Sequence, residues 1–128
     1  MVPSQPGVAT KSFLTVGDSV PKAGGGTYRM VGLPDGLGAF DNGNGTFSLL
    51  SNHELGNTAG AVRDHGAKGA FVSRWTVDKR SLRVRDGKDL IQEIATWNAA
   101  TSTYNAPAKG IALNRLVLRR PRAAVGLL

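Results

Sequence analysis

The stretch GLGAFDNGNGTFSLLSNHELG, residues 36–56, decides the fold class of this chain. Two apolar runs flank the sequence DNGNG, which contains two Asn-Gly steps. Asn and Gly tolerate positive φ angles, so an Asn-Gly step between apolar runs is the strongest short-range indication of a β-hairpin. We therefore expect residues 36–40 and 46–52 to pair as antiparallel strands.

Short strand-like runs recur on both sides of this hairpin, each interrupted by Gly, Asn, Asp or Pro. No segment keeps apolar residues at i, i+3, i+4 and i+7 for three turns, as an amphipathic helix would. In residues 70–78 the side chains alternate, so Phe71, Ser73, Trp75 and Val77 fall on one face. The other predicted strands are residues 12–17, 27–33, 81–87 and 89–98. Residues 89–98 also fit an amphipathic helix. The predicted loops are residues 18–26 and 98–110, and a tight turn is predicted at residues 34–36.

The sum of these patterns predicts an all-β chain built from antiparallel meanders and hairpins. Strands at this spacing are typical of a sandwich, a barrel or a propeller. The order strand, turn, strand in residues 28–52 recurs weakly in residues 70–97, which is compatible with one to two propeller blades. Such a partial propeller has open sheet edges, so we expect self-association through them.

Composition excludes several classes of protein. The chain has 128 residues, 41% of them hydrophobic, which suits one domain or part of a larger one. No apolar run approaches the ~18 residues of a membrane-spanning helix, and the first residues do not form a signal peptide. There is no cysteine, so thiolate metal sites are excluded.

The net charge of +7 does not indicate nucleic-acid binding. Arg115, Arg119, Arg120 and Arg122 lie near the end of the chain, and without them the net charge falls from +7 to +3. The remaining basic residues are scattered and are not interleaved with aromatic residues that could stack on bases. We therefore expect no nucleic-acid partner.

The triplet Asn52-His53-Glu54 is the candidate metal site. A carboxylate just past a strand end is held in place by the sheet and can face a ligand. Glu54 offers a hard oxygen donor suited to Ca²⁺ or Fe³⁺, and the amide oxygen of Asn52 is a weaker candidate neighbour. The structural interpretation is that Asn52 and Glu54 satisfy turn amides while His53 packs partly buried. Local chemistry favours the structural interpretation and leaves the metal site open.

Other motifs fail at a required position. The sequence HELGN has Asn57 where a zinc protease helix needs its second histidine. The sequence DNGNGT has Gly43 where a calcium loop needs a side-chain oxygen. Neither Ser48 nor Ser51 has the flanking glycines of a nucleophile elbow, so catalytic residues cannot be assigned from local motifs.

From residue 12 to about residue 115 the chain resembles the PhoX-type alkaline phosphatase family of bacteria. The resemblance rests on LTVGD at 14–18, on YRMVGLPDGLGAFDNGNGTFSLLSNHELG at 28–56 and on HGAKGAFVSRW at 65–75. The triplet Asn52-His53-Glu54 is the family's most recognisable short signature, and Asp35 lies in another matching motif. The matching region is the N-terminal part of proteins that are several times longer and form a β-propeller.

This resemblance implies an exported, periplasmic or extracellular phosphomonoesterase that uses calcium and iron. The family gathers its metals with Glu, Asp and Cys side chains on loops at one end of the propeller channel. Of that set, only Glu54 can be carried over to this chain. Ca²⁺ needs six or more oxygen ligands, so we expect the chain to bind these metals incompletely and to be inactive alone. The alternative is a non-catalytic β-propeller surface or binding protein.

We divide the chain into an N-terminal extension (1–11), a propeller-like region (12–116) and a basic tail (117–128). Family members continue after an Asn-Arg-Leu-like stretch with Cys-Ser-Ala-Asp-Leu, whereas this chain reads NRLVLRRPRAAVGLL at 114–128. Deletion of one base could restore the family sequence. We therefore expect the residues after Leu116 to be out of frame, with a genuine basic tail as the alternative.

Overall fold

The computed structural model describes residues 2–116, which form strands and loops without a helix. The largest sheet is an antiparallel meander in the order β3-β4-β5-β6. Its strands are β3 (Pro34–Asp41), β4 (Thr46–His53), β5 (Phe71–Asp78) and β6 (Val84–Asp89). Two hairpins complete the fold: β1 (Ser19–Pro21) with β2 (Thr27–Arg29), and β7 (Trp97–Asn98) with β8 (Thr103–Tyr104). The predicted all-β, antiparallel fold is confirmed.

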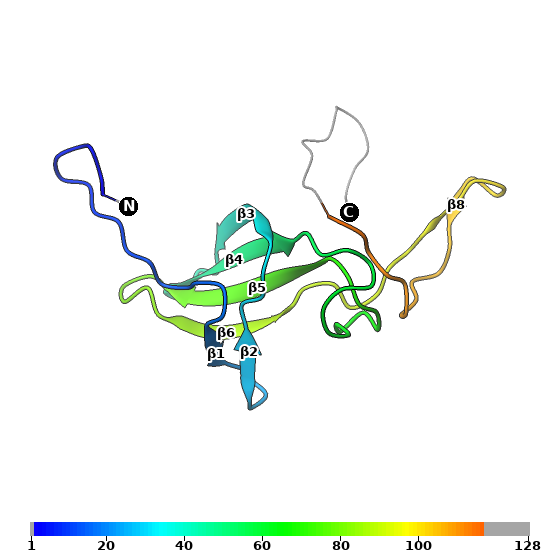
Figure 1. The fold of residues 1–128 in the computed structure, drawn as a ribbon, viewed down its shortest axis with the longest axis horizontal. Coiled ribbons are helices and arrows are strands. Elements are labelled where there is room, and N and C mark those ends of the chain that lie inside the picture. The colour runs from blue at the N-terminus through cyan, green and yellow to red at the C-terminus, as the bar shows by residue number, and fades with distance from the viewer. Residues whose placement is uncertain (1, 117–128) are drawn as a thin grey trace.

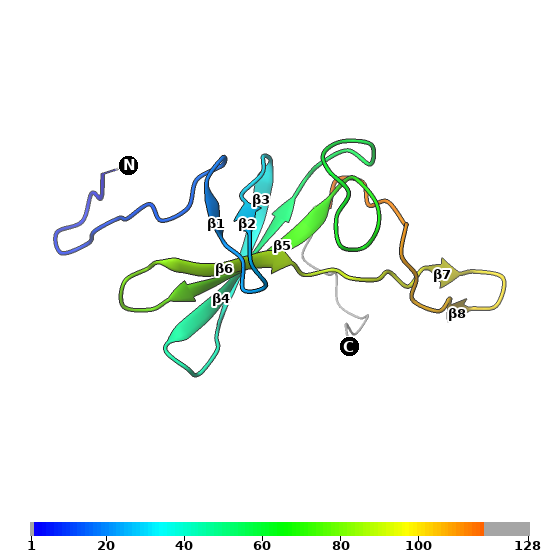
Figure 2. The ribbon, with the colours of Figure 1, turned by 90° about the horizontal axis from the view of Figure 1, so that it is seen from below.

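The four-stranded sheet forms the centre of the molecule, and the β1–β2 hairpin lies against it (Figure 1). The N-terminal segment and the β7–β8 hairpin extend from opposite ends of the sheet (Figure 2). No helix among the described residues is long and apolar enough to cross a membrane. The predicted basic tail, 117–128, lies outside the described residues.

The predicted hairpin at residues 36–52 is confirmed, with Phe40 opposite Ser48. The turn between its strands is closed by its own side chains. The Asp41 carboxylate accepts a hydrogen bond from the Gly43 N–H (2.8 Å), and the Asn44 side-chain oxygen accepts one from the Thr46 N–H (3.2 Å). Gly43 has a φ of 76°, a conformation that glycine adopts without steric cost.

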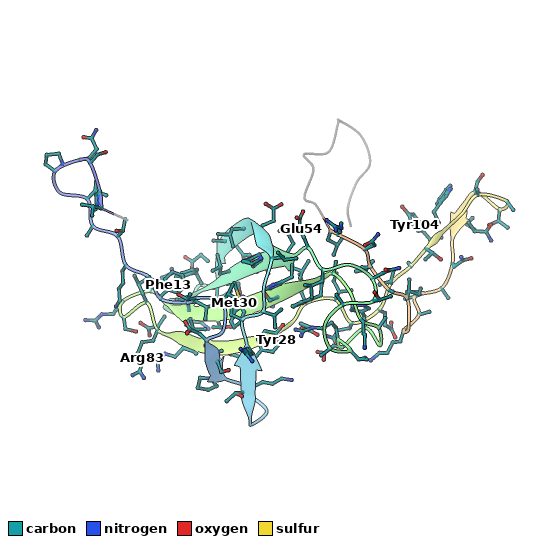
Figure 3. All side chains as sticks on the ribbon, viewed as in Figure 1. Phe13, Tyr28, Met30, Glu54, Arg83 and Tyr104 are labelled. Atoms are coloured by element: carbon teal, nitrogen blue, oxygen red, sulfur yellow. The ribbon has the colours of Figure 1, made fainter. Side chains whose placement is uncertain are left out.

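The core lies on one face of the sheet, under the β1–β2 hairpin. The alternation predicted for residues 70–78 is confirmed, because Phe71, Ser73, Trp75 and Val77 are all buried. Trp75 and Val77 pack with Val20, Tyr28 and Met30 of the segments that cover this face. We call this covered face the inner face of the sheet. Figure 3 shows Phe13, Tyr28 and Met30 on the segments that cover it.

Gly87 of β6 allows the hairpin to approach the sheet closely. A Cβ atom at this position would lie 2.6 Å from the Tyr28 ring and 2.8 Å from the Trp75 ring. The two rings meet edge to face in the space that this glycine leaves, with their centroids 5.1 Å apart.

Several predicted elements are wrong. Residues 12–17 form no strand, while part of the predicted loop at 18–26 forms β1 because its backbone pairs with β2. The predicted turn at 34–36 lies inside β3, where pairing with β4 is irregular between Pro34 and Leu37. Residues 89–98 form no continuous strand, and the predicted loop at 98–110 includes β8. Leu82, predicted to lie in a strand, has a φ of 56° and belongs to the turn before β6.

Candidate functional site

The three residues of the triplet have different environments. His53 is fully buried on the inner face, where its ring stacks on Phe71 with the centroids 4.2 Å apart. Asn52 precedes it in β4 and therefore points to the opposite face, since successive strand residues alternate. The Asn52 side-chain N–H donates to the Leu116 carbonyl oxygen at 2.5 Å.

Glu54 is the member of the triplet that lies past the end of β4. It is half-buried, and its backbone N–H donates to the Leu33 carbonyl oxygen at 2.9 Å. Figure 3 shows Glu54 at the rim of the sheet, away from Tyr28 and Met30. Among residues 2–116, no group of three or more His, Asp or Glu side chains is placed to hold a metal ion. The triplet therefore offers one carboxylate donor and not a converging set of ligands.

His53 is held in place by a chain of hydrogen bonds. Its Nε2 atom lies 2.8 Å from the Ser73 hydroxyl oxygen, which also accepts a hydrogen bond from the Trp75 indole N–H at 2.8 Å. Its Nδ1 atom lies 3.4 Å from the Gly32 carbonyl oxygen. The Ser73 hydroxyl also donates to the Ser51 carbonyl oxygen at 3.2 Å. His53 therefore connects the end of β4 to the core.

A buried ion pair lies beside this histidine. Arg63 donates to both carboxylate oxygens of Asp89, from Nε at 3.1 Å and from Nη2 at 2.5 Å. The same carboxylate accepts hydrogen bonds from the Tyr28 hydroxyl and from the Asp64 N–H (2.9 Å). The ion pair thus joins the loop between β4 and β5 to both β2 and β6.

Phe71 links the ion pair to the triplet. The Arg63 guanidinium carbon lies 3.6 Å from the centroid of the Phe71 ring, and the His53 ring stacks on the same ring. One face of a phenyl ring cannot hold both groups at these distances, so they lie on opposite faces. The guanidinium is attracted to the ring by a cation–π interaction. Phe71 therefore lies between the Arg63 guanidinium and the His53 ring.

Burial sets the charge state of two of these groups. Burial raises the pKa of the Tyr28 hydroxyl, and the Asp89 carboxylate raises it further, so Tyr28 stays neutral and donates. Burial lowers the pKa of His53, and the positive charge of Arg63 also lowers it. Carbonyl oxygens of Gly32 and Val31, and the Asp89 carboxylate, act in the opposite direction. His53 is therefore a neutral packing residue at pH 7 and not an exposed general acid.

We expect stability to fall as the pH is lowered from about 7 to about 5. In this range the unfolded chain protonates His53 near its ordinary pKa of about 6.5, whereas the folded chain resists protonation, so the equilibrium moves toward unfolding. Urea denaturation at several pH values measures the effect, and the His53→Gln variant should show a flatter dependence. An equal slope in both proteins would contradict this assignment. Below this range the carboxylates of Asp41 and Asp78 also contribute to the loss of stability, because their hydrogen-bond partners lower their pKa values in the folded chain.

One hollow beside the sheet lies away from the triplet. A cavity of about 590 Å³ lies over the inner face, lined mainly by apolar side chains that include Phe13, Met30, Leu49 and Trp75. Asp35, which the sequence analysis singled out, lies in β3 and borders this hollow. None of the three triplet residues lines it.

Sequence reasoning did not find the ion pair of Arg63 and Asp89. The two residues are separated by 26 positions, and neither belongs to a local motif. It also missed His65, which is fully buried and has no hydrogen-bond partner for either ring nitrogen among the described residues. The sequence HGAKGAF gave no indication that its histidine would be fully buried.

Searches for a matching protein-family model, for a similar curated protein and for a similar solved structure each found no match.

Proposed function

We propose that this chain is part of a β-propeller protein of the PhoX phosphatase type, in which Glu54 supplies one carboxylate ligand of a calcium and iron centre. The observation that carries the proposal is the position of Glu54. Its carboxylate follows the central strand β4 directly, and the hydrogen bond from its N–H to Leu33 fixes its backbone. The backbone of Glu54 is therefore fixed at the end of the sheet, from which its side chain can reach a ligand.

The number of strands in the largest sheet supports a propeller architecture. A propeller blade is a four-stranded sheet, and β3 to β6 form a four-stranded antiparallel meander. The proposed whole protein would hydrolyse phosphomonoesters, with its metals neutralising phosphate oxygens.

The described residues do not make a complete metal site. Ca²⁺ takes six to eight oxygen ligands, and Glu54 contributes two carboxylate oxygens at most. No catalytic step is therefore assigned to this chain, and the chain alone is expected to be inactive. Asn52 is not proposed as a second ligand, because its side chain is almost completely buried. Its Nδ2 atom donates to Leu116, and its Oδ1 atom has no partner among the described residues.

A non-catalytic propeller that binds a surface ligand is the second candidate. It is favoured by the environment of His53, which is explained by packing against Phe71 and Ser73 without reference to catalysis. In that case Glu54 would bind calcium only or would serve the fold.

The expected inactivity of the chain alone is tested by hydrolysis of p-nitrophenyl phosphate by the purified chain with added Ca²⁺ and Fe³⁺. We expect no hydrolysis above the rate in buffer with metals alone, and the same result for Glu54→Gln. Hydrolysis by the unaltered chain that the Glu54→Gln variant lacks would contradict the expected inactivity of the chain alone.

A further inference from the structure

We propose that two copies of this chain associate by antiparallel pairing of their β3 strands about a two-fold axis at Ala39. The proposal concerns the sheet edge and is independent of any metal at Glu54. It follows from three features of β3: its position in the sheet, its exposed apolar side chains and its self-complementary sequence.

β3 is the edge strand that other strands leave uncovered. Among the described strands it contacts only β4. The opposite edge strand, β6, is contacted by the β1–β2 hairpin, whose Ala23 N–H donates to the Asp86 carboxylate at 2.7 Å. An edge strand presents backbone N–H and C=O groups that can pair with another chain.

The side chains along β3 offer little protection against such pairing. Leu37 is 66% exposed and Phe40 is 49% exposed, and Ala39 between them is also exposed. The strand contains no lysine, and the proline and the irregular pairing that also protect edges are confined to its start, between Pro34 and Leu37. Its two acidic residues lie toward the ends, and one of them, Asp41, pairs with Lys79 at 2.6 Å.

The sequence of β3 is complementary to itself when the axis passes through Ala39. In that register Gly38 of each copy lies opposite Phe40 of the other. An aromatic ring that covers an edge glycine in this way is a known stabilising pair. The space beside Gly38 is open, since a Cβ atom there would meet nothing within 4 Å. The small side chain of Ala39 allows the two strands to approach at the axis.

The register with its axis one residue earlier, at Gly38, is less favourable. If the axis passed through Gly38, Asp35 of each copy would lie opposite Asp41 of the other, and like charges directly opposite are destabilising. With the axis at Ala39, Asp41 lies opposite Leu37 and remains next to its own Lys79. Because both copies use the same strand, the contact closes on itself and gives a dimer.

Single cysteines test the register, since the natural chain contains none. Directly opposed residues of an antiparallel pair have Cα atoms about 4.5–5.5 Å apart, within the range that a disulfide spans. Under mild oxidation the Ala39→Cys protein should form a disulfide dimer about tenfold faster than Ala100→Cys, because pairing raises the effective thiol concentration. Ala100 is a matched control, an exposed alanine between β7 and β8. Equal rates for the two variants would overturn the proposal.

Analytical ultracentrifugation tests the association itself. The unaltered chain should show a monomer–dimer equilibrium. Ala39→Lys should be monomeric because two ammonium groups would meet at the axis, while Ala100→Lys should associate as the unaltered chain does. Ala39 is exposed, so the lysine should not disturb the fold, which circular dichroism checks. An unaltered chain that stays monomeric, or an Ala39→Lys variant that dimerises as strongly, would overturn the proposal.

Discussion

Replacing Asp89 with alanine is expected to lower the free energy of unfolding by about 3–5 kcal/mol, because it leaves the buried Arg63 guanidinium without its counter-ion. Asp89 is 5% exposed and Arg63 is 12% exposed, so water cannot readily replace the lost partner. The substitution also removes the acceptor for the Tyr28 hydroxyl and for the Asp64 N–H. Urea denaturation followed by circular dichroism measures the loss.

A double-mutant cycle separates the ion pair from simple packing. The variant with Arg63→Met and Asp89→Leu should lose less stability than the sum of the two single variants, because neither charge is left buried alone. Lys79→Ala is the matched control, since its ion pair with Asp41 is exposed and its loss should change stability little. Additive effects of Arg63→Met and Asp89→Leu would contradict the assignment of this pair as a coupled, buried unit.

Replacing Trp75 with alanine is expected to cost about 3–5 kcal/mol, the usual range for removing a large aromatic side chain from a core. Trp75 is fully buried, contacts the Tyr28 ring edge to face and donates from its indole N–H to Ser73. The substitution therefore leaves a cavity and also removes a donor from the hydrogen bonds that hold His53.

The same substitution at Trp97 provides the control. Trp97 lies in β7, is 56% exposed and contacts Tyr104 edge to face. Its replacement by alanine should change the free energy of unfolding by no more than about 1 kcal/mol. Circular dichroism is the suitable signal, because each variant lacks one of the two tryptophans and therefore has an altered fluorescence signal. If Trp97→Ala destabilises the protein as much as Trp75→Ala, the core is not where the structure places it.

The parts of the fold that were predictable from sequence are those set by local chemistry. The DNGNG turn closes with hydrogen bonds from its own Asp41 and Asn44 side chains, so neighbouring residues are enough to specify it. The alternation around Trp75 follows from the two-residue period of a strand with one buried face.

Elements that depend on distant partners could not be predicted in this way. Pro34 and Asp35 have strong turn propensity, yet pairing with β4 places them in a strand. β1 and β2 are three residues long and have little strand pattern of their own; they are stabilised by packing of Val20 and Tyr28 on the sheet. Local propensity carries no information about such contacts.

In the candidate site, too, local features could be predicted from the sequence and contacts between distant residues could not. The sequence indicated that Glu54 follows a strand end, which the boundary of β4 agrees with. It did not indicate that His53 would be fully enclosed, because the Phe71 and Ser73 side chains around it come from the neighbouring strand. The role of Arg63 depends on a contact with β6 that no local pattern specifies.

The central claim is that metal-binding chemistry in the triplet belongs to Glu54, while His53 and Asn52 serve the fold. A calcium titration followed by ¹H–¹⁵N NMR, on the unaltered chain and on Glu54→Gln, tests it most directly. We expect shifts concentrated at the amides of Glu54 and Leu55, with half-saturation above about 1 mM because one carboxylate holds Ca²⁺ weakly, and loss of these shifts in the variant. Shifts that persist in Glu54→Gln, or that are absent around residue 54 in the unaltered chain, would contradict the account.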